Sequence, residues 1–153
     1  MEARLPNPAT LLPDVNPAMQ QLIKAAHTGG APETVLELVH LRASQINGCS
    51  FCVDWGWRLG RKSGVSDEKL FTVAAWREVP YFDDAERAAL DLAEHATRLA
   101  DCSDPVPDHV WNAAAEHFTD EQLASIVLWV AVTNMFNRVN ATIRQPADAG
   151  KSG

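Results

Sequence analysis

The amino-acid sequence predicts an all-α fold. Apolar residues recur at helical spacing along almost the whole chain, and no stretch has the strict apolar and polar alternation of a half-buried strand. The predicted helices are separated by Gly and Pro residues, and several of them begin at residue types that commonly cap helices. With 153 residues, 46% of them hydrophobic, the chain has the size and composition of one domain with a substantial core.

Three regions are expected along the chain. Residues 1–14 contain three prolines and are predicted to form an extended arm. Residues 15–144 are predicted to fold as one helical domain of about six to seven helices, because the apolar periodicity continues through this range. Residues 145–153 are polar, with Pro and Gly, and are expected to form a flexible tail.

The first two helices are predicted over residues 17–27 and 32–46. Two glycines stop the first helix, and a proline suits the first turn of the second because that position needs no backbone N–H. Asn47 and Gly48 tolerate left-handed backbone geometry and end the second helix. A third helix is therefore expected to open directly after them and to end near Gly64.

Two further helices are predicted in the middle of the chain. The first covers about residues 66–77 and begins with Ser66, whose side chain can accept from the first-turn N–H groups. The second begins at Asp83, and Glu86 three residues later makes this start resemble a capping box. It carries a narrow apolar stripe that should pack closely on a neighbouring helix. The stripe consists of Ala85, Ala89, Leu92, Ala96 and Leu99.

Two helices are predicted near the C-terminus. A short helix covers about residues 108–117, and a capping box of Thr119 and Gln122 opens a long one that ends near Arg144. Residues 123–132 of the long helix are apolar nearly all round. This pattern predicts either a central helix or one that a second subunit covers.

Charge and hydropathy exclude several function classes. The formal net charge of −7 and the pI near 5.1 argue against a nucleic-acid partner, because such proteins neutralise phosphates with clustered Lys and Arg. No uninterrupted apolar run approaches the roughly 20 residues of a membrane span, so no membrane partner is expected. The N-terminus lacks the basic and apolar regions of a signal peptide. A cytoplasmic protein with reduced thiols is therefore expected.

Cys49 and Cys52 form a CxxC at the start of a predicted helix. The helix N-terminus favours thiolate over thiol, and the spacing lets the two sulfurs meet, so one can attack a peroxide and the other can resolve the sulfenic acid as a disulfide. No cofactor other than this redox-active dithiol is predicted. Two alternatives stay open, namely a zinc site completed by residues such as His27, His40 or Cys102, and a pair of inert buried thiols.

A longer segment around the CxxC resembles a known family. Residues 37–54 read ELVHLRASQINGCSFCVD, and residues 134–138 on a long apolar helix read NMFNR. Together they are similar to the alkylhydroperoxidase D-like, carboxymuconolactone decarboxylase superfamily, in which a glutamate stands twelve residues before the first cysteine of the CxxC, as Glu37 does here. The resemblance covers about residues 15–144.

The resemblance implies a thiol-dependent hydroperoxide reductase built as a helical subunit that assembles into trimers, dimers or hexamers. By the same resemblance, Cys52 reacts with the hydroperoxide, Cys49 resolves the resulting sulfenic acid, and Glu37 is the acidic end of a proton relay. A dithiol protein partner reduces the disulfide. Two other functions are weighed: a non-catalytic redox sensor or binding protein, and a lactone decarboxylase, against which the CxxC counts.

The chain departs from the family at its proton relay. The position four residues after the second cysteine, usually histidine, is Gly56, and a histidine found in some members between the cysteines is replaced by Phe51. His40 is the nearest substitute, three residues after Glu37, with a surface or interfacial histidine beside Arg42 as the alternative. Gly56 is interpreted as opening space over Cys52. The tryptophans beside it, Trp55 and Trp57, are expected either to line that space or to pack in the core or an interface.

Three other polar residues are expected to have structural roles. Asn134 and Asn137 lie one turn apart on an apolar helix and are predicted to be hydrogen-bonded structural groups. Asp54 is expected to support the helix start, and Cys102, between acidic residues, to be unreactive. The alternative for Glu37 is a solvated position paired with a nearby arginine, either Arg42 or Arg61.

Overall fold

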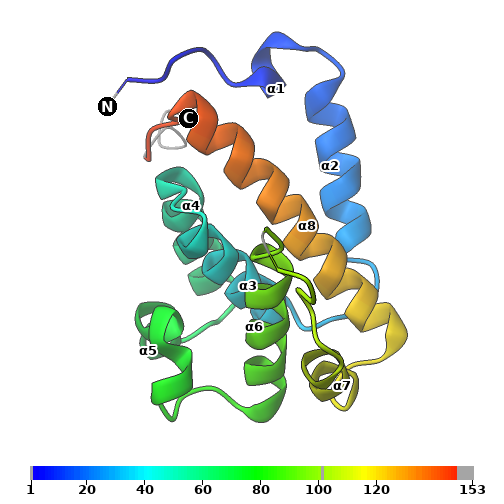
Figure 1. Ribbon diagram of the computed structural model, residues 1–153. Helices are drawn as coiled ribbons and strands as arrows, with labels where there is room; N and C mark the ends of the chain where they lie inside the picture. Colours follow the sequence, from blue (N-terminus) through cyan, green and yellow to red (C-terminus); the bar gives the residue numbers. More distant parts are fainter. Residues whose placement is uncertain (1, 101, 148–153) are drawn as a thin grey trace.

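The structure is an all-α bundle, as the sequence predicts. The computed structural model describes residues 2–100 and 102–147, and within these ranges it contains eight α-helices, one 3-10 helix and no strand (Figure 1). The elements are α1 (Pro8–Leu11), α2 (Val15–Ala26), α3 (Glu33–Ile46), α4 (Ser50–Lys62), α5 (Asp67–Thr72), η1 (Val73–Glu78), α6 (Asp84–Thr97), α7 (Asp108–Ala115) and α8 (Asp120–Ile143). Helices α2–α8 correspond to the predicted helices, and α1 is additional.

Helix α3 lies at the centre of the bundle, where α4, α6 and α8 all pack against it. One apolar cluster lies between α3, α6, α7 and α8, and a second joins α3 to α5 and η1. Figure 1 shows α8 crossing the molecule diagonally, with α2 beside it. Because α3 is enclosed on several sides, its polar residues Glu37 and His40 are buried together with its apolar ones.

Local capping signals set several helix starts. The Asp83 carboxylate accepts from the Glu86 N–H while the Glu86 side chain accepts from the Asp83 N–H, so the predicted capping box forms at α6. Thr119 and Gln122 form the same reciprocal pair at α8. These contacts satisfy N–H groups that have no partner inside a helix.

Two predicted helix boundaries are wrong. The helix expected over residues 66–77 is broken into α5 and η1, with non-helical backbone at Ala75. This break allows Trp76 to be buried and to donate its indole N–H to Glu94. The next helix, α6, ends before the last member of its predicted stripe, and Leu99 is 55% exposed. The helix ends at Arg98, so Leu99 no longer follows the helical spacing that directs the other apolar residues toward the core.

The N-terminal arm folds over the end of α8 (Figure 1). The expected extended arm contains one helical turn, α1, and its Arg4 N–H donates to the Ile143 carbonyl at 2.8 Å. The Arg4 guanidinium also donates to the Thr142 carbonyl at 3.0 Å. The arm is therefore tied to the C-terminal turn of α8. Of the expected flexible tail, residues 148–153 lie outside the described ranges.

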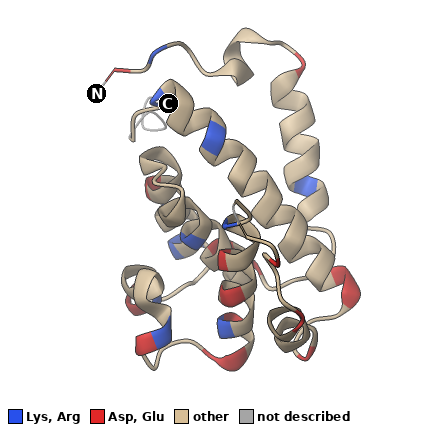
Figure 2. Ribbon diagram, in the orientation of Figure 1, with Lys and Arg blue, Asp and Glu red and all other residues tan. Residues whose placement is uncertain are grey.

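Most of α8 is covered by its own chain, since α2, α3 and α6 pack against it. An outward strip stays uncovered, with Val127 40% and Met135 37% exposed. The central position predicted for this helix is thus found, while the homo-oligomer stays a prediction. Figure 2 shows charged residues concentrated around α5, α6 and α7. In the part of the chain that the structure describes, no helix has the length and hydropathy needed to cross a bilayer.

Candidate active site at the Cys49 and Cys52 disulfide

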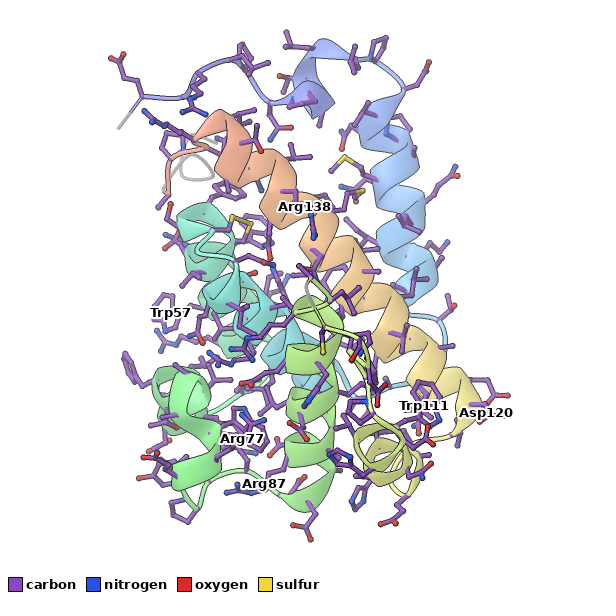
Figure 3. The ribbon with its side chains drawn as sticks, in the orientation of Figure 1. Trp57, Arg77, Arg87, Trp111, Asp120 and Arg138 are labelled. Carbon is purple, nitrogen blue, oxygen red and sulfur yellow. A yellow bond between two sulfur atoms is a disulfide. The ribbon has the colours of Figure 1, made fainter. Side chains whose placement is uncertain are left out.

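Cys49 and Cys52 form a disulfide at the N-terminal end of α4, drawn in Figure 3 as a yellow bond. Cys49 is the N-cap residue, and its sulfur accepts from the Cys52 N–H at 3.3 Å. The predicted position of the CxxC at a helix start is therefore found. Both residues are buried, with Cys49 2% and Cys52 3% exposed.

The turn before the CxxC is fixed to α8. Gly48 has a positive φ of 65°, which a glycine adopts without steric cost, and it reverses the chain between α3 and α4. The Asn47 amide donates to Asn134 Oδ1 at 2.9 Å and to Asn137 Oδ1 at 2.8 Å. Asn137 in turn donates to Ser44 Oγ at 3.1 Å. The two asparagines of α8 thus have the structural hydrogen bonds predicted for them, and these bonds hold the start of α4 in place.

Cys52 lines a cavity of about 140 Å³ between α2, α3, α4 and α8. The cavity walls are mainly apolar and aromatic, and Trp55, at 44% exposure, lies at the edge where the cavity meets solvent. Among the described residues, His40 is the only titratable side chain on these walls besides Cys52. The full lining is Ile23, His40, Phe51, Cys52, Trp55, Trp129, Phe136 and Asn140. Cys49 is not part of it, so a molecule in the cavity meets the sulfur of Cys52.

Behind His40 lies Glu37, one turn earlier on α3. Glu37 is 2% exposed and His40 is 5% exposed. The Oε2 atom of Glu37 lies 3.6 Å from the Nδ1 atom of His40. Within the described part of the chain neither of these two atoms has a hydrogen bond. Buried polar atoms without partners are rare and tend to occur where a site does chemistry. The His40 ring is held from the side by Trp129, edge to face at 5.6 Å.

The alternatives considered for Glu37 and His40 are not what the structure shows. Arg42 donates to Glu94 at 2.6 Å, and Arg61 pairs with Asp67 at 3.3 Å, so neither arginine neutralises Glu37. His40 is buried and lies on the cavity wall, not on the surface beside Arg42. The structure therefore places Cys52 and His40 on the wall of one cavity, with Glu37 next to His40 and Cys49 bonded to Cys52.

The interpretation of Gly56 as open space over Cys52 is wrong. A Cβ atom at Gly56 would lie 3.5 Å from the Cα atom of Leu41, an ordinary contact distance, so this position faces α3 and not the cavity. Of the two tryptophans expected to line that space, Trp55 lines the cavity. Trp57 packs against the second apolar cluster, and the Arg61 guanidinium lies over its ring at 5.1 Å.

Sequence reasoning missed Asn140. Its Nδ2 lies 3.4 Å from Cys52 Sγ and donates to it, and the residue is 6% exposed on the cavity wall. One sequence signal could have identified it: Asn134, Asn137 and Asn140 recur at intervals of three on an apolar helix, which places them on one face.

The remaining candidates lie apart from this site. Asp54 pairs with Arg58 at 3.1 Å, one turn along α4. Cys102 is an exposed free thiol in the segment between α6 and α7, and it donates to the Asp104 carbonyl. No group of three or more His, Cys, Asp or Glu residues within 2–100 and 102–147 is arranged to hold a metal ion. His27 instead pairs with Glu33 at 3.1 Å.

Comparison with known proteins places the chain in a family. The model of the carboxymuconolactone decarboxylase family matches residues 13–95. The uncharacterized protein YdfG of Bacillus subtilis is 32% identical over 130 residues, which cover 85% of this chain and 87% of that protein. A crystal structure from Agrobacterium tumefaciens is similar with a TM-score of 0.88 and 30% identity, covering 95% of this chain and 98% of that one. It is described as a protein of unknown function and a candidate antioxidant defence protein AhpD.

The same fold also occurs in the debrominase Bmp8, whose structure has a TM-score of 0.78 and 21% identity and covers 90% of this chain and 73% of that one. The matched segment of the family model spans more than half of the chain and contains the CxxC, Glu37 and His40. The protein described here therefore belongs to the carboxymuconolactone decarboxylase family and has an alkylhydroperoxidase D-like fold.

Proposed function

We propose that this protein is a thiol-dependent hydroperoxide reductase in which Cys52 is the reacting thiol. One observation carries the proposal: Cys52, disulfide-bonded to Cys49, shares a small apolar cavity with His40, and Glu37 lies directly behind His40. A nucleophilic thiol, a proton-transferring imidazole and an orienting carboxylate are the parts that general acid and base catalysis requires.

The proposed reaction begins with the reduced dithiol. The Cys52 thiolate attacks the terminal oxygen of a hydroperoxide ROOH, the O–O bond breaks, and the alkoxide takes a proton and leaves as ROH. The oxidised product on Cys52 is a sulfenic acid. The Cys49 thiolate then attacks Cys52 Sγ, the disulfide forms, and the sulfenic oxygen leaves as water after protonation. Each cycle thus moves two electrons from the dithiol to the hydroperoxide.

His40 is the proposed carrier of the proton. Its Nδ1 faces Glu37, so Nε2 is the nitrogen that can face a molecule in the cavity. The imidazole takes the proton of the Cys52 thiol and gives it to the departing alkoxide. Glu37 stabilises the imidazolium that exists between these two transfers. This arrangement replaces the histidine that the family usually has at the position of Gly56.

The cavity indicates the class of substrate. Its volume is about 140 Å³ and its lining is mostly aromatic and aliphatic, with His40, Cys52 and Asn140 as the polar groups. Small apolar pockets of this kind favour a ligand with an apolar body and one polar end. A small alkyl hydroperoxide fits this description better than hydrogen peroxide, which has no apolar part to bury.

A dithiol protein is the proposed reductant. One of its thiolates attacks the Cys49–Cys52 disulfide, and its second thiol resolves the mixed disulfide, which restores both thiols of this protein. Such a partner stays reduced in a compartment like the cytoplasm, where we propose that the protein acts. A homo-oligomer is the proposed assembly.

A redox sensor without turnover is the second candidate, and the burial of both sulfurs favours it. Because Cys49 and Cys52 are only 2% and 3% exposed, attack by a bulky protein dithiol requires the start of α4 to move. A sensor would form the disulfide once and would be reduced slowly. An enzyme would turn over many times.

Consumption of hydroperoxide with dithiothreitol as the reductant tests the proposal. Wild-type protein should remove many equivalents of tert-butyl hydroperoxide, and Cys52→Ser should remove none. Cys49→Ser that is reduced and then freed of dithiothreitol before the hydroperoxide is added should stop at a Cys52 sulfenic acid that dimedone traps. Cys102→Ser is the matched control and should behave as wild type. A single equivalent consumed by wild-type protein would favour the sensor, and retention of activity in Cys52→Ser would contradict the assignment of the reacting thiol.

A further inference from the structure

The N-terminal arm and the end of α8 meet at the sulfur of Cys52. Asn140 Nδ2 donates to Cys52 Sγ at 3.4 Å, and Asn140 Oδ1 accepts from Asn7 Nδ2 at 3.2 Å. Asn7 is the N-cap residue of α1. A short relay of two side-chain amides thus connects the arm to the sulfur that lines the cavity.

The direction of both amides follows from a backbone group. The Ala9 N–H can only donate, and it donates to Asn7 Oδ1 at 3.0 Å. The Asn7 NH2 group therefore points to Asn140 and requires an oxygen there. Because Asn140 presents its oxygen to Asn7, its own NH2 group is the end that faces Cys52. The Ala9 N–H thus fixes the orientation of the Asn7 amide, and the Asn7 amide fixes the orientation of the Asn140 amide.

The arm is held where this relay needs it. The Arg4 backbone and guanidinium both donate to carbonyls in the last turn of α8, Ile143 and Thr142. On the other side, the Asn140 side chain is nearly fully buried, so water does not compete freely for its hydrogen bonds. The relay is therefore built into the junction of the arm and the helix.

We propose that Asn140 is a further catalytic residue, which activates Cys52 by donating a hydrogen bond to its thiolate, and that Asn7 is the positioning residue that orients the Asn140 amide. A hydrogen bond to the charged form of a group favours that form, so in the reduced protein this bond favours the thiolate of Cys52 over its thiol. Cys49 has a different donor, the backbone N–H of Cys52. The two thiols of the CxxC are thus stabilised by different groups.

Other groups near Cys52 do not provide this contact. His40 is the other titratable group on the cavity wall, and Glu37 lies behind it, so these two can exchange a proton with Cys52 but belong to α3. The walls from α2 and α8 contribute Ile23, Trp129 and Phe136, which carry no charge. Asn140 is the group on α8 that donates directly to the sulfur. The inference rests on the proposed function only in taking Cys52 as the reacting thiol.

The test measures the reactivity of Cys52 alone, without any hydroperoxide. In protein carrying Cys49→Ser and Cys102→Ser, Cys52 is the one thiol left, and its alkylation by iodoacetamide is followed as a function of pH. Serine is itself a good N-cap residue, so α4 keeps its start. Asn140→Leu should slow alkylation at neutral pH about tenfold, the scale of one hydrogen bond to a charged group. The whole profile should move to higher pH.

Asn7→Asp tests the positioning step. The new carboxylate still accepts from the Ala9 N–H and keeps the cap, but it cannot donate to Asn140. It should draw the Asn140 NH2 group toward itself and turn the Asn140 oxygen toward the sulfur, which moves the profile in the same direction as Asn140→Leu. Arg4→Ala is the control, since it removes the guanidinium contact with Thr142 but keeps the backbone hydrogen bond to Ile143 and both amides of the relay, and its profile should match that of the parent.

The outcomes separate this inference from the proposed function. An unchanged alkylation profile in Asn140→Leu would overturn the role of Asn140, whether or not the wild-type protein reduces hydroperoxides. An unchanged profile in Asn7→Asp alone would overturn the role of Asn7. A shifted profile in a protein that does not consume hydroperoxide would support the relay while contradicting the proposed function. Helix content by circular dichroism shows that each variant is folded.

Discussion

Two buried glutamates, Glu37 on α3 and Glu94 on α6, have opposite surroundings. Glu94 is 4% exposed and accepts hydrogen bonds from four side chains. The donors are Arg42, Trp76, Arg77 and Arg98, and Figure 3 shows Arg77 on the side of η1 that faces α6. Glu37 is 2% exposed, and within the described part of the chain its Oε2 has no hydrogen bond and lies 3.6 Å from His40.

The difference separates a carboxylate that holds helices together from one that has the role we propose in proton transfer. Burial opposes the ionisation of Glu94, but the hydrogen bonds from Trp76 and the arginines outweigh this effect and lower its pKa from 4.5 to about 2. Its charge ties α3, η1 and α6 together. Within residues 2–100 and 102–147, Glu37 Oε2 has no hydrogen bond, and it faces His40, which shares a cavity with Cys52. Substitution of Glu94 should therefore lower stability, and substitution of Glu37 should lower the rate of reaction with hydroperoxide.

The largest expected effect is on stability and belongs to Glu94. Glu94→Gln should lower the free energy of unfolding by about 3 kcal/mol, because removing one partner of a buried ion pair leaves the other uncompensated. Glu37→Gln, the matched isosteric change, should alter it by less than about 1 kcal/mol, since no formed hydrogen bond is lost. Urea denaturation of the two variants measures both values. Equal losses of stability would remove the distinction between the two sites.

Acid should reveal the same contrast. Because the pKa of Glu94 is lowered in the folded protein, its contribution to stability is complete above pH 4.5 and is lost as the pH falls toward about 2. The loss amounts to roughly 3 kcal/mol. Urea denaturation at several pH values between 7 and 2 should show wild-type stability falling more steeply than that of Glu94→Gln. Parallel curves for the two proteins would contradict the depressed pKa.

The next effect is on rate and belongs to the pair behind Cys52. His40→Gln should slow the reaction of reduced protein with tert-butyl hydroperoxide at least about 10²-fold, the usual scale of general acid and base help. Glu37→Gln should slow it by a smaller factor, because it acts through His40. Stopped-flow tryptophan fluorescence or loss of hydroperoxide measures these rates. Glu94→Gln, assayed under conditions where it is folded, should react as wild type, and a loss as large as that of His40→Gln would show that the two regions are coupled.

The smallest expected effect concerns Gly56. Since a Cβ atom there meets Leu41 at an ordinary contact distance of 3.5 Å, Gly56→Ala should fit and should stabilise the helix by up to about 1 kcal/mol. The rate with hydroperoxide should not change, because this position faces α3 and not the cavity. Thermal unfolding and the hydroperoxide assay check both statements. A slower reaction in Gly56→Ala would restore the idea that this position borders the substrate.

Features set by neighbours in sequence could be predicted, and features set by distant contacts could not. The capping boxes at Asp83 and Thr119 and the CxxC at a helix start depend on residues three apart, and all three are found. The pairing of Glu37 with His40 is also one turn along a helix. The break at Ala75 depends instead on Trp76 reaching Glu94 on another helix.

The same limit applies within the site. Asn140 follows Cys52 by 88 residues, and its direction depends on Asn7 in the arm. Helical periodicity places Asn140 on the face of Asn134 and Asn137 but does not say which helix that face meets. The predicted role of Gly56 fails for a related reason, because the sequence does not show that α3 passes close to it at Leu41.

Site-resolved oxidation of the three cysteines tests whether the CxxC reacts with a hydroperoxide before any other thiol of the protein. Fully reduced protein is treated with less than one equivalent of tert-butyl hydroperoxide, quenched by alkylation, and the state of each cysteine is read by mass spectrometry. Cys102 is an internal reference because it is exposed and lies outside the site. We expect the Cys49–Cys52 disulfide to form first while Cys102 stays reduced. Oxidation of Cys102 before the CxxC, or of all three at equal rates, would contradict it.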